Sequence, residues 1–162
     1  MKALKNLNDK LAAVIKVTSI IFYIVMLITA SLQIVMRFVF KSPLAWTDEV
    51  SKYTFVWGTM LGCAYLVRTQ GHSSVQALEN LFKKNPSARK FQKLIIDIFC
   101  LIFYLIVAIG GISYTSCGLT SVTPALGFPV YIIYAIMPIT GFMMTLFQLE
   151  HLFNDLTEKE VK

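Results

Sequence analysis

Four long apolar blocks, separated by short polar connections, dominate the hydrophobic pattern of this chain. The blocks cover residues 17–39, 46–67, 94–117 and 130–153. Each block is long enough to cross a hydrocarbon core of about 30 Å as an α-helix. The pattern therefore predicts an all-α membrane protein with four transmembrane helices, in a single membrane domain over residues 1–162. We expect the first block to be retained, because it is too long for a signal-peptide core and no small-residue cleavage site follows it.

Two polar stretches have the period of an amphipathic helix. Apolar residues recur at steps of three and four in residues 3–16, and the pattern repeats in residues 73–84. Such helices lie in the membrane interface with their basic residues toward the lipid headgroups. We therefore predict two short interfacial helices, with solvated linker helices as the alternative. The side chains that this reading places at the membrane interface are Arg68, His72, Lys83 and Lys84.

The basic residues are unevenly distributed along the chain. Arg37, Lys41 and Lys52 stand apart, and the other 12 of the 15 lysines and arginines lie in the N-terminal tail, the second connection and the C-terminal tail. With four spans, these three regions share one side of the membrane, and an excess of lysine and arginine marks the cytoplasmic side. Both termini are therefore predicted to be cytoplasmic, which places Asp48 and Glu49 at the outer face.

The composition agrees with a membrane protein. Hydrophobic residues make up 56% of the 162 positions, charged residues make up only 15%, and the mean hydropathy is +0.65. A soluble domain of this length needs more polar surface than that. We assign the net charge of +6 to the cytoplasmic connections and not to nucleic-acid binding.

No catalytic or metal-binding set is evident in the sequence. Cys63, Cys100 and Cys117 stand singly, without a CxxC or Cys/His cluster, so we expect them to be packing residues. The middles of the first, third and fourth blocks contain no charged side chain, although a proton relay or ion path normally needs one there. Asp97 is expected to pair with Lys93 one turn away. We therefore expect neither an enzyme nor a cofactor or metal site in this chain.

The second block begins with polar and interfacial residues: Trp46, Thr47, Asp48, Glu49 and Lys52. Asp48 and Lys52 are four residues apart and are expected to pair along the helix. Glu49 is expected to share Lys52 or to reach Arg37. Trp46 suits the headgroup level, and Thr47 is a candidate helix cap. These residues give a stable helix start, and the sharper hypothesis is that they also contact another protein.

Small residues mark positions where another helix can approach closely. Gly58 and Gly62 form a GxxxG pair in the second block, and such pairs favour helix association in lipid, where packing drives assembly. The helix that packs on them is either a partner's or another helix of this chain. Similar approach points are offered by Gly110, Gly111, Gly118 and Gly141.

Prolines and a glycine shape the last part of the chain. The third connection carries no charge, and Pro124, Gly127 and Pro129 are expected to hold it in a tight outer turn. Pro138 lies inside the fourth block. We expect it to free a backbone carbonyl and to kink that helix, because proline has no N–H to donate.

The order of four motifs resembles a known family. The sequence reads MRFVF, then WTDEVSKYTFVWGTMLG, then RTQGHSSV and finally TPALGFPVYIIYAIMPI, from about Arg37 to Pro138. This order resembles the small membrane subunit, or DctQ-type subunit, of tripartite ATP-independent periplasmic (TRAP) transporters. Two positions depart from the family pattern: Lys52 stands near an expected arginine, and Gln76 replaces an acid after His72.

The resemblance implies a non-catalytic role in secondary active transport. Such subunits have four membrane helices in the bacterial or archaeal inner membrane and pack on the scaffold of a large membrane subunit, which carries the substrate and sodium sites. A periplasmic binding protein delivers an organic acid such as a dicarboxylate or sialic acid. By this resemblance, Trp46, Asp48 and Glu49 lie in the outer contact region, Gly58 and Gly62 lie on a packing seam, and the third connection faces the soluble protein. The alternatives are an anchor subunit of another complex or a small stand-alone transporter.

Overall fold

The computed structural model describes residues 2–69 and 86–157, and over these residues the chain is all-helical. Its helices are α1 (Lys2–Phe38), α2 (Ala45–Arg68), α4 (Pro86–Cys117), α5 (Val130–Tyr134) and α6 (Ile136–Thr157). The predicted all-α class is thereby confirmed. The predictions made for His72, Gln76, Lys83, Lys84 and the interfacial helix over residues 73–84 lie outside the described residues.

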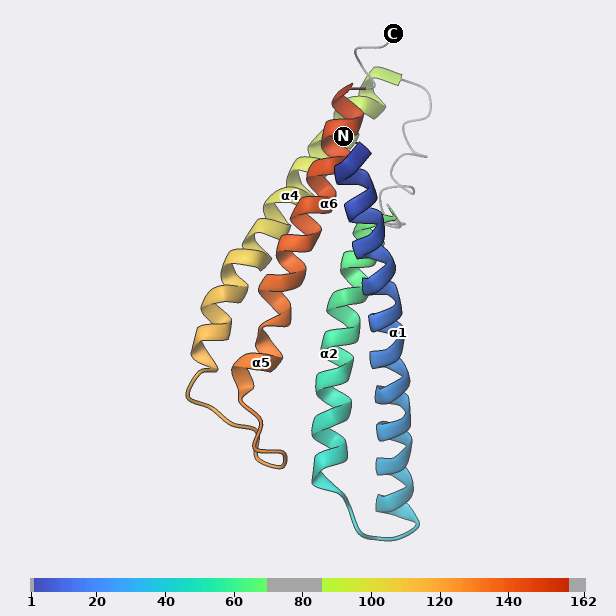
Figure 1. The fold of residues 1–162 in the computed structure, drawn as a ribbon, viewed down its shortest axis with the longest axis vertical. Helices are drawn as coiled ribbons and strands as arrows, with labels where there is room; N and C mark the ends of the chain where they lie inside the picture. The colour runs from blue at the N-terminus through green and yellow to red at the C-terminus, as the bar shows by residue number, and fades with distance from the viewer. Residues whose placement is uncertain (1, 70–85, 158–162) are drawn as a thin grey trace.

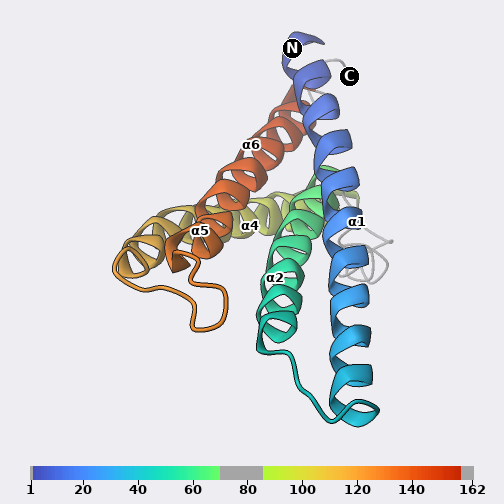
Figure 2. The ribbon, with the colours of Figure 1, turned by 60° about the horizontal axis from the view of Figure 1, so that its bottom comes forward.

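The helices form two pairs, α1 with α2 and α4 with α6 (Figure 1). The pairs meet near the end of the molecule where α1 begins and α6 ends, and they diverge toward the opposite end (Figures 1 and 2). The buried apolar core lies at this junction and combines residues of α1, α2, α4 and α6, among them Ile15, Ala64, Tyr104 and Phe147. The start of α1 and the end of α6 therefore lie on the same side of the molecule (Figure 1).

Three helical segments of the described chain are long and apolar enough to cross a membrane: Asn8–Phe38, Leu94–Cys117 and Val130–Phe153. The last two have the bounds of the third and fourth predicted spans, and the first contains most of the predicted first span but begins nine residues before it. α2 begins and ends within one residue of the predicted second span and has 24 residues. It has sufficient length but a more polar composition, since its first two turns carry three charged side chains.

α1 is longer than the predicted first span. The helix continues without interruption from Lys2 to Phe38, so residues 3–16 do not form a separate interfacial helix. The physical reason is that no proline or glycine interrupts this stretch and that Ala12 and Ile15 are buried in the core. α1 ends where Lys41 adopts a left-handed conformation (φ 51°) and the Ser42 N–H donates back to the Met36 carbonyl (3.1 Å).

The fourth predicted span is broken, as its internal proline indicated. The helix is interrupted at Ala135 between α5 and α6, three residues before Pro138. Pro138 has no N–H for the carbonyl of Tyr134, four residues earlier, so the regular helix is lost there. α4 comes close to this break, because a Cβ built on Gly111 would lie 2.7 Å from the Pro138 nitrogen. Gly141 makes an equally close approach to α4, with a built Cβ 2.6 Å from the Ala108 nitrogen.

The Gly58/Gly62 pair is used inside the chain. A Cβ built on Gly58 would lie 3.4 Å from the Phe22 Cβ, and one built on Gly62 would lie 3.5 Å from the Ser19 Oγ. The Ser19 hydroxyl also donates to the Gly58 carbonyl (2.8 Å). The placement of these glycines at a partner interface is therefore corrected, because the seam that they form is occupied by α1.

Candidate functional site

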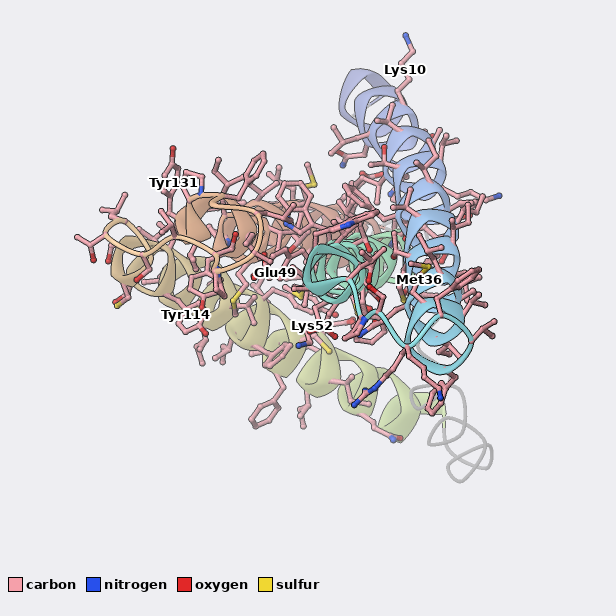
Figure 3. All side chains as sticks on the ribbon, turned by 90° about the horizontal axis from the view of Figure 1, so that it is seen from below. Lys10, Met36, Glu49, Lys52, Tyr114 and Tyr131 are labelled. Atoms are coloured by element: carbon pink, nitrogen blue, oxygen red, sulfur yellow. The ribbon has the colours of Figure 1, made fainter. Side chains whose placement is uncertain are left out.

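The N-terminal end of α2 holds a buried carboxylate that binds a distant loop. The Glu49 side chain accepts the Ala125 N–H at Oε1 (2.9 Å) and the Leu126 N–H at Oε2 (3.1 Å). Glu49 is only 7% exposed, and it lies between α2 and the loop that joins α4 to α5 (Figure 3). The structure thus corrects the expectation that Glu49 shares Lys52 or reaches Arg37. Its negative charge is met by two backbone donors of a segment far away in the sequence.

The loop that Glu49 holds is a tight turn, as predicted. The Thr123 N–H donates to the Phe128 carbonyl (2.8 Å), and the Gly127 N–H donates to the Thr123 carbonyl (2.9 Å). The buried Thr123 hydroxyl also accepts the Phe128 N–H (3.0 Å). Gly127 has φ +65°, a conformation that favours glycine, and Pro124 and Pro129 restrict the backbone on either side. The turn-forming residues therefore shape a defined loop.

A charged pair lies on the other face of the same helix turn. Lys52 donates to the Asp48 carboxylate, which confirms the predicted pair, and Gln33 of α1 donates to Asp48 as well (3.2 Å). The Lys52 side chain is 66% exposed. We call Asp48 and Lys52 the outer rim. Trp46, two residues before Asp48, is also exposed.

Thr47 does not cap α2. The N-cap position belongs to Leu44, which makes no capping side-chain bond. Thr47 lies within the first turn, fully buried, and its hydroxyl donates to the Leu44 carbonyl (2.7 Å). The prediction of a threonine cap is therefore wrong, because the helix begins two residues earlier, at Ala45.

The opposite end of α2 holds an ion cluster in which Arg68, Glu150 and Asn8 are shielded from solvent and Asp9 is exposed. Arg68 donates to Asp9 of α1 (2.6 Å) and to Glu150 of α6 (3.0 Å), and Asn8 also donates to Glu150. The His151 ring nitrogen lies 3.2 Å from the Arg68 carbonyl oxygen. Burial acts to lower the pKa of Arg68, but its hydrogen bond with Asp9 and the charge of Glu150 raise it above its ordinary value. We call Asn8, Asp9, Arg68 and Glu150 the inner cluster.

The inner cluster corrects one prediction and adds residues that sequence reasoning missed. The Arg68 side chain is only 10% exposed and joins three helices, so it does not extend toward lipid headgroups. Glu150 carried a signal, because it is the one acid within the fourth apolar block. The sequence gave no signal for Asp9, since an acid in a lysine-rich tail is expected to be solvated. Asp97 accepts from Gln148 of α6 (2.9 Å), and the side chain of its expected partner Lys93 lies outside the described residues.

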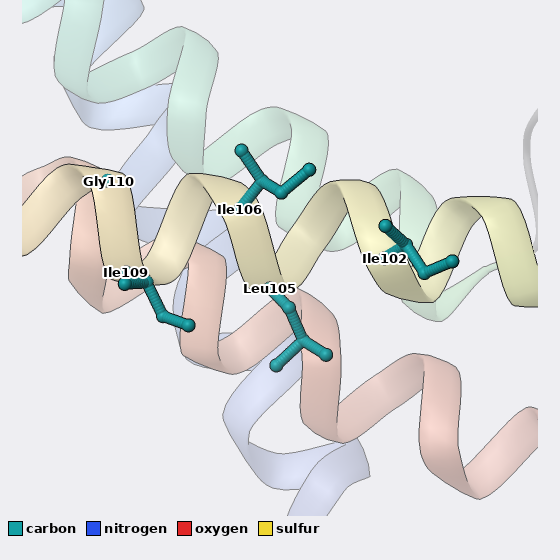
Figure 4. Close-up of a pocket in the computed structure, with 5 residues that line it drawn as sticks. All are labelled: Ile102, Leu105, Ile106, Ile109 and Gly110. Atoms are coloured by element: carbon teal, nitrogen blue, oxygen red, sulfur yellow. The ribbon is translucent and has the colours of Figure 1, made fainter.

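Within the described part of the chain, the side chains offer little chemistry. No group of His, Cys, Asp and Glu there could hold a metal ion, and Cys63, Cys100 and Cys117 are free. Cys63 and Cys117 are exposed, so neither packs in the interior of this chain. A shallow groove of about 330 Å³ on α4 is lined entirely by apolar residues: Ile102, Leu105, Ile106, Ile109 and Gly110 (Figure 4). Such a surface suits lipid or another helix and has no polar group to orient a solute.

Comparison with known proteins matches this chain to components of one transporter family. A family model described as "Tripartite ATP-independent periplasmic transporters, DctQ component" matches residues 24–158. A putative TRAP transporter small permease protein of Haemophilus influenzae is 28% identical over 131 residues, which are 81% of this chain and 80% of that protein.

Two further relatives match over shorter segments. The sialic acid TRAP transporter permease protein SiaT of Haemophilus influenzae is 40% identical over 76 residues, which are 46% of this chain but only 12% of that protein. The C4-dicarboxylate TRAP transporter small permease protein DctQ of Vibrio cholerae is 27% identical over 82 residues, which are 51% of this chain and 34% of that protein.

Proposed function

This chain belongs to the DctQ family of TRAP transporter components, and from that premise we propose that it is a scaffold subunit that packs on a large membrane subunit. The observation that carries this proposal is the family match over residues 24–158 of a chain whose helix interiors are uncharged. Tyr53–Val67 and the 52 residues from Ile98 to Leu149 contain no Asp, Glu, Lys, Arg or His. A protein that carries an ion or an anionic solute normally places such a side chain in the membrane.

The proposed topology has four crossings and cytoplasmic termini. α2 runs beside α1 and α6, so its more polar composition is tolerated where other helices cover it. The start of α1 and the end of α6 lie together, and the basic residues concentrate on that side of the proposed topology. This orientation puts the outer rim on the periplasmic face of the inner membrane.

The proposed partners divide the transport work. The large membrane subunit carries the substrate and sodium sites, and a periplasmic binding protein delivers an organic acid for sodium-coupled symport. Two relatives are named for sialic acid and for C4-dicarboxylates, which supports an anionic substrate class. The relative named for sialic acid is much longer than the segment it shares with this chain, which supports a close association with a larger permease. We propose that the outer rim helps to dock the binding protein.

Co-expression with the large membrane subunit of the same transporter tests the scaffold role. We expect the two chains to co-purify in mild detergent as a stable complex. Proteoliposomes that contain both chains and the binding protein should take up the organic acid under an inward sodium gradient. Vesicles that contain this chain alone should take up none. Separation of the two chains during purification, or uptake by this chain alone, would contradict the proposal, and the second result would favour a stand-alone transporter.

A further inference from the structure

In the second half of the loop between α4 and α5, every backbone N–H group donates within the protein. From Thr123 to Val130, the prolines at 124 and 129 have no N–H, and the other N–H groups all donate within the protein. These donors belong to Thr123, Ala125, Leu126, Gly127, Phe128 and Val130. Two of these six N–H groups donate to the Glu49 carboxylate. A loop in water can leave such donors to the solvent, but a loop in a water-poor region has to satisfy them internally.

The surface of the loop is apolar and uncharged. No Asp, Glu, Lys, Arg or His occurs between Asp97 and Glu150, a stretch that contains the whole loop. Its exposed side chains include Leu119 (62%), Val122 (65%) and Phe128 (54%). These residues continue the exposed apolar face of α4, which is long and apolar enough to cross a membrane.

Aromatic side chains surround the base of the loop. Tyr114 at the end of α4 and Tyr131 at the start of α5 are both exposed and lie on opposite sides of this part of the molecule (Figure 3). The rings of Tyr114 and Tyr134 are in contact at a tilt of 38°, with centroids 4.3 Å apart. Exposed tyrosines with an apolar ring and a wet hydroxyl are enriched where a bilayer meets water. α1 and α2 also extend beyond the loop along their common direction, so the loop does not form the outermost part of the chain (Figure 1).

We propose that residues 118–129 lie in the lipid interface of the bilayer, where the Glu49 carboxylate takes the place of water as the acceptor for two loop donors. A lipid occupant fits better than a soluble protein, because surfaces that bind soluble partners reversibly surround their apolar centre with a polar rim. The loop offers such a partner no charge. This assignment goes beyond the scaffold function and leaves the exposed Asp48–Lys52 pair as the docking surface for the binding protein.

Spin labels at two loop positions test the proposal. Leu126→Cys and Phe128→Cys are made in a background in which Cys63, Cys100 and Cys117 are replaced by Ala. The full chain is reconstituted in phosphatidylethanolamine/phosphatidylglycerol vesicles, alone and with the co-expressed large subunit. Collisions with oxygen, which concentrates in lipid, are compared with collisions with a water-soluble nickel chelate. Ile106→Cys on the apolar face of α4 is the lipid reference, and Lys10→Cys, exposed near the start of α1, is the aqueous reference.

The expected result is that both loop labels favour oxygen over nickel, as the label at position 106 does, with and without the large subunit. A ratio that matches position 10 would overturn the proposal, and protection from nickel by added binding protein would do the same in favour of a docking surface. Loss of both collision rates only when the large subunit is present would overturn it in favour of a protein contact. Because the scaffold role is judged by co-purification, either idea can fail without the other.

A variant pair tests the part assigned to Glu49. Glu49→Gln keeps the size of the side chain but retains one acceptor oxygen, whereas Asp48→Asn makes the same change on the exposed acid. With Glu49→Gln, the label at position 126 should become more mobile and at least two-fold more accessible to nickel, while the label at position 106 stays unchanged. Asp48→Asn should leave both labels as they are. An unchanged loop in Glu49→Gln would show that the carboxylate does not replace water.

Discussion

At the scale of single residues, two neighbouring acids have opposite surroundings. Successive residues of an α-helix point about 100° apart, so Asp48 faces Lys52 and Gln33 while Glu49 faces the loop. Sequence reasoning predicted the Asp48–Lys52 pair because a pair four residues apart depends only on the local helix. It missed the true partner of Glu49, since the acceptor and the Ala125 donor are 76 residues apart and only the packing of α2 beside the loop brings them together.

Replacing Glu49 should therefore cost stability where replacing Asp48 does not. Glu49→Ala leaves the N–H groups of Ala125 and Leu126 without an acceptor, and each unsatisfied buried donor costs about 1–3 kcal/mol. We expect a loss of about 3 kcal/mol in the free energy of unfolding, measured by denaturation in mixed micelles. Asp48→Ala removes only an exposed pair and serves as the matched control. Equal losses in the two variants would contradict the assigned roles.

The outer rim makes a separate prediction for transport. Lys52→Glu places two negative charges at positions 48 and 52 on an exposed face, where like charges disfavour any partner selected for the original pair. We expect uptake to fall at least five-fold through a weaker apparent affinity for the binding protein, with complex yield unchanged. Proteoliposome uptake titrated with binding protein measures this. A lower maximal rate at unchanged apparent affinity would place the effect inside the large subunit instead of at docking.

At the scale of elements, sequence periodicity located the helices but misplaced the start of two of them. The bounds of α2, the end of α4 and the α5–α6 break follow from local signals such as apolar length and Pro138, whereas α4 begins at Pro86, eight residues before the predicted third span. The start of the first span was placed near residue 17, where the lysine-rich tail ends, yet α1 runs through that point as one helix. Polar residues of its first half, such as Asn8, are buried by contacts with α6, which no pattern within residues 2–38 reveals.

The α4–α6 pair depends on the absence of side chains at two positions. Gly111→Ala would put a Cβ 2.7 Å from the Pro138 nitrogen, so one backbone has to move, whereas Gly110 has open space beside it. We expect Gly111→Ala to lower the midpoint of thermal unfolding of the purified complex by several degrees, since overpacking costs about 1–3 kcal/mol. The adjacent Gly110→Ala is the control and should leave the midpoint unchanged. A tolerated Gly111→Ala would mean that the two helices lie further apart than described.

At the scale of the whole molecule, two helix pairs are joined near both ends by an acid that accepts from a distant segment. Glu49 connects α2 to the loop before α5, and Glu150 connects α6 to Arg68 of α2. Between these points the pairs diverge (Figure 1). Sequence reasoning could state that charged residues lie at the ends of the apolar blocks. It could not state which helices they join, because that follows from the relative placement of all the helices.

The inner cluster should accordingly fix the spacing of the two pairs. Arg68→Gln leaves the Glu150 carboxylate, 7% exposed, without its cation, and breaking one side of a buried ion pair costs on the order of 3 kcal/mol. Because the pKa of Arg68 is raised above its ordinary value, its guanidinium stays charged across the working pH range, and buffer pH cannot mimic the removal of that charge. Spin labels at Ile28→Cys on α1 and Ile106→Cys on α4, both exposed, report the separation of the pairs. We expect pulsed dipolar measurements to give a broader distance distribution in Arg68→Gln and an unchanged one in Lys10→Gln, which alters an exposed charge on α1.

The double variant Arg68→Met/Glu150→Met should recover much of the lost stability, since apolar replacement of a whole buried pair is often neutral. A distribution as narrow in Arg68→Gln as in the parent chain would show that apolar packing at the helix junction suffices to hold the scaffold together.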